Sequence, residues 1–80
     1  MALNKLEYET KILTGRVTFR SRYNNKTGTL GGEAEDYPAG SVVEIVKNGR
    51  EYGSPQLVLV KVDDLDGNPM YAWVTKKALR

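Results

Sequence analysis

Basic side chains are concentrated between residues 11 and 26, where they could bind a polyanion. Five cations occur in this stretch with no acid among them: Lys11, Arg16, Arg20, Arg22 and Lys26. Tyr23 lies beside them, and proteins that bind single-stranded nucleic acid combine a basic groove with aromatic side chains on which bases stack. One hypothesis is therefore nucleic-acid binding through Arg16, Arg20, Arg22 and Lys26. The competing interpretation is a solvated strand face in which Arg20 packs on the scaffold and pairs with an acid. A net charge of only +2 favours this second interpretation.

Four aromatic side chains could instead line a groove that receives an extended peptide: Tyr23, Tyr37, Tyr52 and Trp73. In the segment 70–75, Tyr71 and Trp73 share one face and Met70, Ala72 and Val74 share the other, so only one face need belong to the core. Trp73 also has the size that the core of a small domain requires. Core packing is therefore the favoured interpretation of Trp73, and a place in a groove is the alternative.

Catalytic and metal chemistry have little support in this sequence. The 80 residues contain no Cys and no His, which removes disulfides, most zinc sites, haem ligation and histidine-based acid–base catalysis. No serine has a histidine to activate it. The acids at 63–66 lack the Gly and Glu of a calcium-binding loop. We expect a protein that is not an enzyme and has no cofactor, metal site or catalytic residue.

The elements that must position these residues are predicted to be strands. Alternating or continuous apolar patterns predict strands at 11–14, 16–23, 41–47, 56–62 and 70–75, with 56–62 buried on both faces. A long loop is expected at 24–40, interrupted at most by a short strand near Thr29 and Leu30. Asn48-Gly49 predicts a two-residue hairpin, and Asp66-Gly67 predicts a second turn. The last residues, KKALR, are expected to form one helical turn capped by Thr75.

The order of these segments resembles the bacterial SH3-like (SH3b) domain. Residues 17–21 (VTFRS), 37–45 (YPAGSVVEI), 59–62 (LVKV) and the end of the chain from Gly67 to Leu79, with Ala72-Trp73-Val74, match its succession of short motifs. The resemblance implies a small barrel. It also implies that the protein binds cell-wall peptides or other proteins as a non-catalytic accessory.

The sequence thus predicts an all-β fold, a small SH3-like barrel of five to six short antiparallel strands with a terminal helical turn. The predicted organisation is an N-terminal arm at 1–10 and one domain at 11–80. The leading functional hypothesis is recognition of a protein or peptide through Tyr23, Tyr37, Tyr52 and Trp73, and the alternatives are nucleic-acid binding and cell-wall peptide binding. The first residues lack the apolar run of an export signal, and no segment is apolar enough to span a membrane. We therefore expect a cytoplasmic protein without membrane contact, which disfavours the cell-wall alternative.

Overall fold

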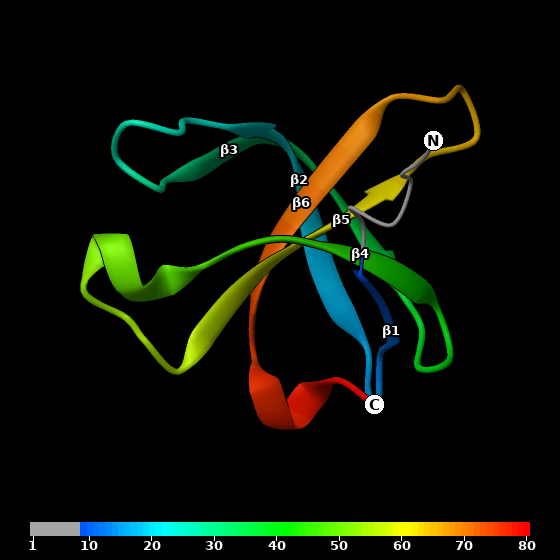
Figure 1. Cartoon of the computed structure of the whole chain (residues 1–80). Coiled ribbons are helices and arrows are strands. Elements are labelled where there is room, and N and C mark those ends of the chain that lie inside the picture. Colours follow the sequence, from blue (N-terminus) through cyan, green and yellow to red (C-terminus); the bar gives the residue numbers. More distant parts are fainter. Residues whose placement is uncertain (1–8) are drawn as a thin grey trace, which may run out of the picture.

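The computed structural model describes residues 9–80, which form an all-β domain (Figure 1). The elements, in chain order, are β1 (Glu9–Ile12), β2 (Val17–Tyr23), β3 (Leu30–Tyr37), β4 (Val42–Asn48), the 3₁₀ helix η2 (Gly49–Tyr52), β5 (Leu57–Asp63), β6 (Pro69–Thr75) and the 3₁₀ helix η3 (Lys76–Ala78). The six strands form one antiparallel sheet in the order β1-β4-β5-β6-β2-β3. The predicted fold class is confirmed, although β1 and β3 do not pair, so hydrogen bonds do not close the sheet into a complete barrel. No helix in this part of the chain is long and apolar enough to cross a membrane.

The predicted N-terminal arm is mostly outside the described residues. Residues 1–8 are not described, whereas Glu9 and Thr10 already belong to β1 and pair with Ile45 and Glu44. The first strand therefore begins two residues earlier than the pattern predicts.

The core lies on one face of the sheet and is built mainly from β5 and β6. Its buried side chains are Leu13, Phe19, Val43, Val58, Val60, Val62, Met70, Ala72 and Val74. Successive residues of a strand point to opposite faces, which explains why the core residues of β6 alternate with Tyr71 and Trp73. Leu59 has no exposed surface although it faces away from Val58 and Val60, so the prediction that this strand is buried on both faces is confirmed.

The C-terminal residues pair with the outer edge of β1. Ile12 and Arg80 exchange two backbone hydrogen bonds of 3.0 and 2.8 Å, and Leu13 forms a bridge with Leu79. The predicted terminal helical turn is present as η3. Thr75 occupies its N-cap position, but the Thr75 side chain makes no capping hydrogen bond.

The predicted loop at 24–40 is wrong for about half of its length, because the eight residues Leu30–Tyr37 form β3. This strand has the sequence LGGEAEDY, which is poor in the branched and aromatic residues typical of strands. It forms because β2 supplies a pairing partner from Val17 to Tyr23, with a register shift between Arg20 and Arg22. All of its residues are exposed or half-buried, as suits an edge strand without a second neighbour.

The two predicted turns have different outcomes. Asn48-Gly49 does not form a two-residue hairpin. The Asn48 side chain instead caps η2 by accepting a hydrogen bond of 2.9 Å from the backbone N–H of Arg50, and β5 begins only at Leu57. The turn around Asp66-Gly67 is confirmed. The Asp64 carboxylate organises it by accepting backbone hydrogen bonds from Asp66 and Asn68.

Candidate binding groove

The face of the sheet opposite the core carries the candidate binding residues. Arg20 on β2 and Lys61 on β5 both pair with Tyr71 on β6. Residues directly opposite one another in a sheet point to the same face, so these three side chains form a row on the outer face. All three are half-buried. The sheet therefore places an aromatic ring between two cations.

Tyr52 and Trp73 hold the 24–29 loop against this face. The Trp73 indole N–H donates a hydrogen bond of 2.7 Å to the carbonyl of Gly28, and the Tyr52 hydroxyl donates one of 2.6 Å to the carbonyl of Asn25. The two rings pack edge to face with their centroids 5.7 Å apart. Figure 1 shows the tip of the β2–β3 hairpin and η2 on the same side of the molecule, as these bonds require. Trp73 therefore packs on the outer face, and the expectation that it belongs to the core is wrong, because the core side of β6 is taken by Met70, Ala72 and Val74.

Tyr23 links this loop anchor to a second aromatic pair. Its hydroxyl lies 3.0 Å from the Tyr52 hydroxyl, and its ring lies 5.3 Å from that of Tyr71. Burial and then the hydrogen bond to Tyr52 raise the pKa of Tyr23, although the nearby charge of Lys47 acts against this. Tyr23 is consequently a neutral hydrogen-bonding group throughout the physiological pH range.

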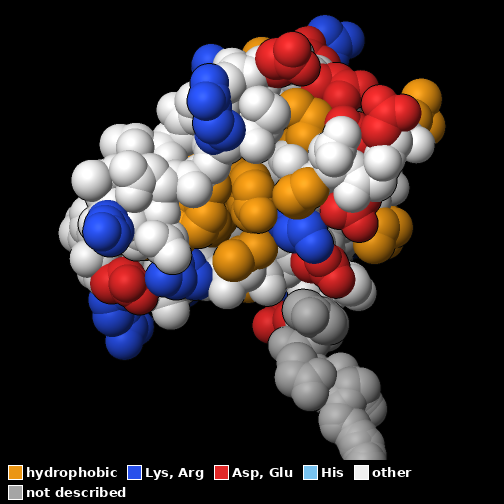
Figure 2. All heavy atoms as spheres, turned by 90° about the horizontal axis from the view of Figure 1, so that it is seen from above, with side chains coloured by type: hydrophobic (Ala, Val, Ile, Leu, Met, Phe, Trp, Pro, Cys, Tyr) orange, Lys and Arg blue, Asp and Glu red, His pale blue; other side chains and the backbone are white. Residues whose placement is uncertain are grey.

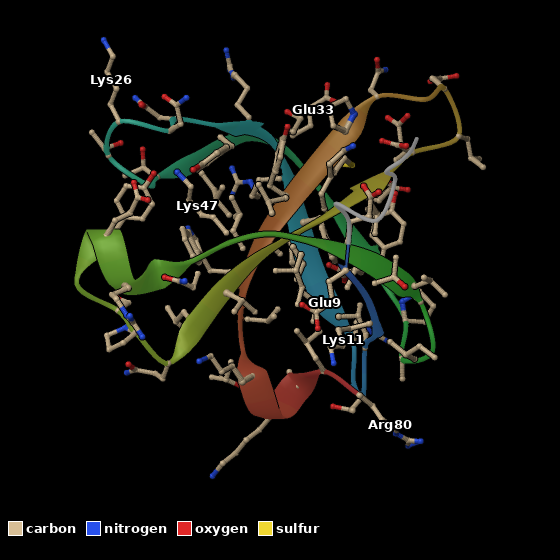
Figure 3. All side chains as sticks on the ribbon, viewed as in Figure 1. Glu9, Lys11, Lys26, Glu33, Lys47 and Arg80 are labelled. Atoms are coloured by element: carbon tan, nitrogen blue, oxygen red, sulfur yellow. The ribbon has the colours of Figure 1, made fainter. Side chains whose placement is uncertain are left out.

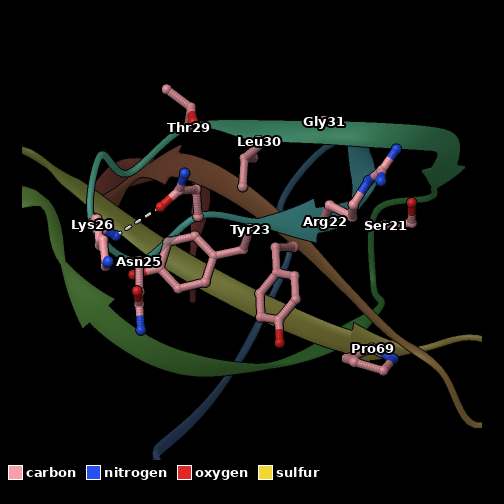
Figure 4. A pocket seen from close by; sticks show the side chains of 11 residues that line it. Ser21, Arg22, Tyr23, Asn25, Lys26, Thr29, Leu30, Gly31 and Pro69 are labelled. Carbon is pink, nitrogen blue, oxygen red and sulfur yellow. Dashed lines mark hydrogen bonds between the residues drawn. The ribbon is translucent and has the colours of Figure 1, made fainter.

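An open groove of about 1040 Å³ runs along Tyr23 and Tyr71. Its lining residues are Ser21, Arg22, Tyr23, Asn24, Asn25, Lys26, Thr29, Leu30, Gly31, Pro69 and Tyr71. We call this surface the tyrosine groove. Figure 4 shows Lys26 at the loop end of the groove, Pro69 at the other end and Tyr23 between them. The groove thus combines flat apolar surfaces with polar groups, and its charged lining residues are both basic.

Among the described residues, the two cations of the tyrosine groove lack the ion pairs that three lysines make, and they share this with Arg16, Arg20, Arg50, Lys76, Lys77 and Arg80. Lys11, Lys47 and Lys61 each lie 3.4 Å from a glutamate. Within residues 9–80, neither Arg22 nor Lys26 has a carboxylate within 4 Å. Figure 3 shows Lys26 extending outward from the tip of the β2–β3 hairpin. The positive charge of the groove is therefore not neutralised by neighbouring acids.

Arg16 and Arg20 lie outside the groove. Arg16 precedes β2 and is exposed, whereas Arg20 is half-buried and donates a hydrogen bond of 2.8 Å from Nη2 to the carbonyl of Gly32. The expectation that Arg20 pairs with an acid is wrong, since no carboxylate among the described residues lies within 4 Å of it. Its partner is the backbone of β3, at the point where the β2–β3 register shifts. The row of arginines thus divides into a structural residue, Arg20, and a groove residue, Arg22.

Tyr37 lies apart from the other three predicted aromatic residues. It pairs with Val17 at the start of β2, whereas Tyr23 is at the end of that strand, and its ring packs edge to face on Phe19 at 5.1 Å. Burial raises the pKa of Tyr37, and the negative charges of Glu35 and Asp64 add to the effect. Tyr37 therefore belongs to an acidic part of the surface.

This acidic part forms a second depression beside the tyrosine groove. Glu33, Glu35 and Asp64 are among its lining residues, and it shares Ser21 and Pro69 with the tyrosine groove. In Figure 2, hydrophobic side chains gather near the middle of the visible face, with Lys and Arg mainly on one side and Asp and Glu mainly on the other. One side of this surface is therefore mainly basic and the other mainly acidic, and the two sides meet near Pro69.

The structure places three of the predicted site residues, Arg22, Tyr23 and Lys26, along one groove. Sequence reasoning did not assign Pro69 or Leu30 to a binding surface. A signal for Tyr71 was present, because it alternates with the core residues Met70 and Ala72. The contribution of Leu30 depends on β3, which has a weak strand pattern.

No protein-family model, curated protein sequence or solved structure matches this chain. The case for a function therefore depends on the geometry of the groove and on the chemistry of its side chains.

Proposed function

We propose that the chain is a non-catalytic module that binds an extended peptide segment of a partner protein in the tyrosine groove. The observation that carries the proposal is the pair of half-buried rings of Tyr23 and Tyr71, 5.3 Å apart, in an open groove completed by Pro69 and Leu30. Aromatic side chains that are held rigidly offer a large contact area at little cost in conformational entropy. Resemblance to SH3-like domains agrees with this class of function.

Tyr52 and Trp73 have an indirect part in this proposal. Their polar atoms already bind the 24–29 loop, so they fix the wall of the groove that carries Asn25 and Lys26. Tyr71 differs, because no hydrogen bond to its hydroxyl occurs within the described part of the chain. Its hydroxyl and ring edge are therefore available to a peptide.

Selection of peptides from a random display library tests the proposal. Peptides selected on the wild-type domain should bind Tyr71→Ser at least about tenfold more weakly, as expected when a central aromatic contact is lost. Leu65→Ser is the matched control, because Leu65 is fully exposed in the β5–β6 turn and does not line the groove. Selected peptides that bind Tyr71→Ser as tightly as wild type would place recognition elsewhere.

A second candidate function is the binding of single-stranded nucleic acid. It is favoured by the unneutralised charges of Arg22 and Lys26 next to the ring of Tyr23. Titration with labelled oligonucleotides should then give an affinity that falls steeply with salt and that decreases in Arg22→Ala and Lys26→Ala. Absence of binding at low salt would end this candidate.

A further inference from the structure

We infer that the tyrosine groove selects an acidic peptide, with an Asp or Glu side chain on Arg22 and an aromatic or proline side chain on Tyr71 and Pro69. This inference rests on the proposed function and adds the chemical class of the ligand. It follows from three features of the surface, which are the free cations, the shape of the arginine and the position of the acids.

The first feature is the distribution of ion pairs. The lysines at 11, 47 and 61 are neutralised by Glu9, Glu51 and Glu44. Arg22 and Lys26, which line the groove, have no such partner in the described part of the molecule. An anionic group that enters the groove can therefore pair with Arg22 or Lys26 without displacing a carboxylate of the described residues.

The second feature is the placement of Arg22. It is an exposed residue near the end of β2, and its Nε lies close to Gly32, where the register between β2 and β3 shifts. A guanidinium group presents parallel N–H donors that match the two oxygens of a carboxylate. The rings of Tyr23 and Tyr71 line the same groove as Arg22, so other residues of an extended peptide that binds Arg22 can face aromatic surface.

The third feature is the acidic depression that begins at Ser21 and Pro69. Glu33, Glu35 and Asp64 repel an anionic chain that continues past Pro69. A nucleic acid carries a negative charge at every nucleotide, whereas a peptide can place its acids at one end only. The polarity of the surface therefore favours a short acidic peptide motif over a polyanion that runs across the whole face.

Four synthetic peptides test this inference, each acetylated and amidated so that its ends carry no charge. The probe is Gly-Ser-Asp-Glu-Phe-Pro-Gly-Ser. In the first two matched peptides Asn-Gln or Lys-Lys replaces Asp-Glu, and in the third Gly-Gly replaces Phe-Pro. Binding is measured by titration into the ¹⁵N-labelled domain, with amide shifts identifying the surface in contact. The acidic probe should bind roughly threefold to tenfold more tightly than its Asn-Gln counterpart, and the amides around Arg22 and Tyr71 should move.

Arg22→Gln is the variant that isolates the charge. It should remove the preference for Asp-Glu over Asn-Gln and leave the contribution of Phe-Pro. Lys77→Gln removes the same charge at an exposed position of η3 and should leave the preference unchanged. Both variants change exposed side chains, and their amide spectra report directly whether the fold is retained.

The other outcomes separate the inference from the function on which it rests. Equal binding of the Asp-Glu and Asn-Gln peptides in the groove overturns the acidic preference and leaves peptide binding intact. Binding of an oligothymidine with the same amide shifts, and of no peptide, overturns both. Self-association of the domain that is abolished by Arg22→Gln also overturns the inference, because the occupant of the groove would then be the acidic depression of a second copy.

Discussion

The substitution Gly28→Ala should destabilise the domain by detaching the 24–29 loop from Tyr52. Gly28 has a φ of +79°, and a Cβ at this position would lie 2.8, 2.9 and 3.0 Å from three carbons of the Tyr52 ring. A left-handed conformation costs a residue with a Cβ about 1–2 kcal/mol. The overlap with the ring adds about 1–3 kcal/mol, as other overpacked sites do, because Tyr52 must move away from Asn25 and Trp73.

Gly67→Ala is the matched control for this prediction. Gly67 has a φ of +82°, close to that of Gly28, but no atom outside its immediate chain neighbours lies within 4 Å of the Cβ position. The control therefore carries the cost of the backbone conformation alone. The difference between the two variants, about 1–3 kcal/mol, measures the contact between the loop and the ring.

Thermal and urea unfolding measure this difference. For a domain of 80 residues, 1 kcal/mol corresponds to a change of roughly 4–8 °C in Tm, so Gly28→Ala should melt at least about 4 °C below Gly67→Ala. Trp73 is the only tryptophan, and its fluorescence should change in the folded state of Gly28→Ala alone. Equal Tm values for the two variants, with unchanged fluorescence, would refute the conclusion that Tyr52 seats the loop.

Three further predictions concern Arg20, Tyr37 and the open edge of β3. Arg20→Ala should cost about 1–3 kcal/mol in urea unfolding because it leaves a β3 carbonyl without its donor, whereas the exposed Arg16→Ala should change stability by less than about 0.5 kcal/mol. The raised pKa of Tyr37 means that its contribution to stability is complete below pH of about 10 and is lost as pH rises through the folded pKa. Glu35→Gln should lower that pKa in a spectroscopic titration, and an unchanged Tyr37 titration would contradict the contribution assigned to the charge of Glu35. The double variant Glu33→Thr with Glu35→Thr should increase self-association in light scattering, because it removes like charges from the open edge of β3; a strictly monomeric double variant would argue against this protective role.

The sequence predicts the parts of this fold that depend on local pattern. The apolar run from Leu57 to Val60 indicates a strand buried on both faces. The alternation from Met70 to Thr75 predicts that one side of β6 enters the core, but it does not show which side. The turn at Asp66-Gly67 follows from residue types that favour turns. These elements need no information from distant parts of the chain.

The missed elements are those that depend on distant partners. The strand β3 is specified by its pairing with β2, and its Gly and Glu residues by themselves favour a loop. Asn48-Gly49 has the composition of a tight hairpin, but Gly49 lies buried where a Cβ would collide with the backbone carbonyl of Ser54. Gly49 is therefore required because close packing leaves no room for a side chain. In the sequence, a glycine required for this reason looks the same as a glycine required by a tight turn.

The candidate site shows why a count of aromatic residues is a weak guide to a binding surface in a small domain. Trp73 and Tyr52 use their polar atoms to hold the chain's own loop, and Tyr37 packs on Phe19. Each of these rings is large enough to bind a partner, but each already has one within the domain. Tyr71 packs on Tyr23, but it lines the groove and its hydroxyl has no hydrogen bond among the described residues. A substitution there should therefore reduce binding with the amide spectrum otherwise retained. Substitution of Trp73 should instead reduce stability and binding together, because the wall of the groove depends on it.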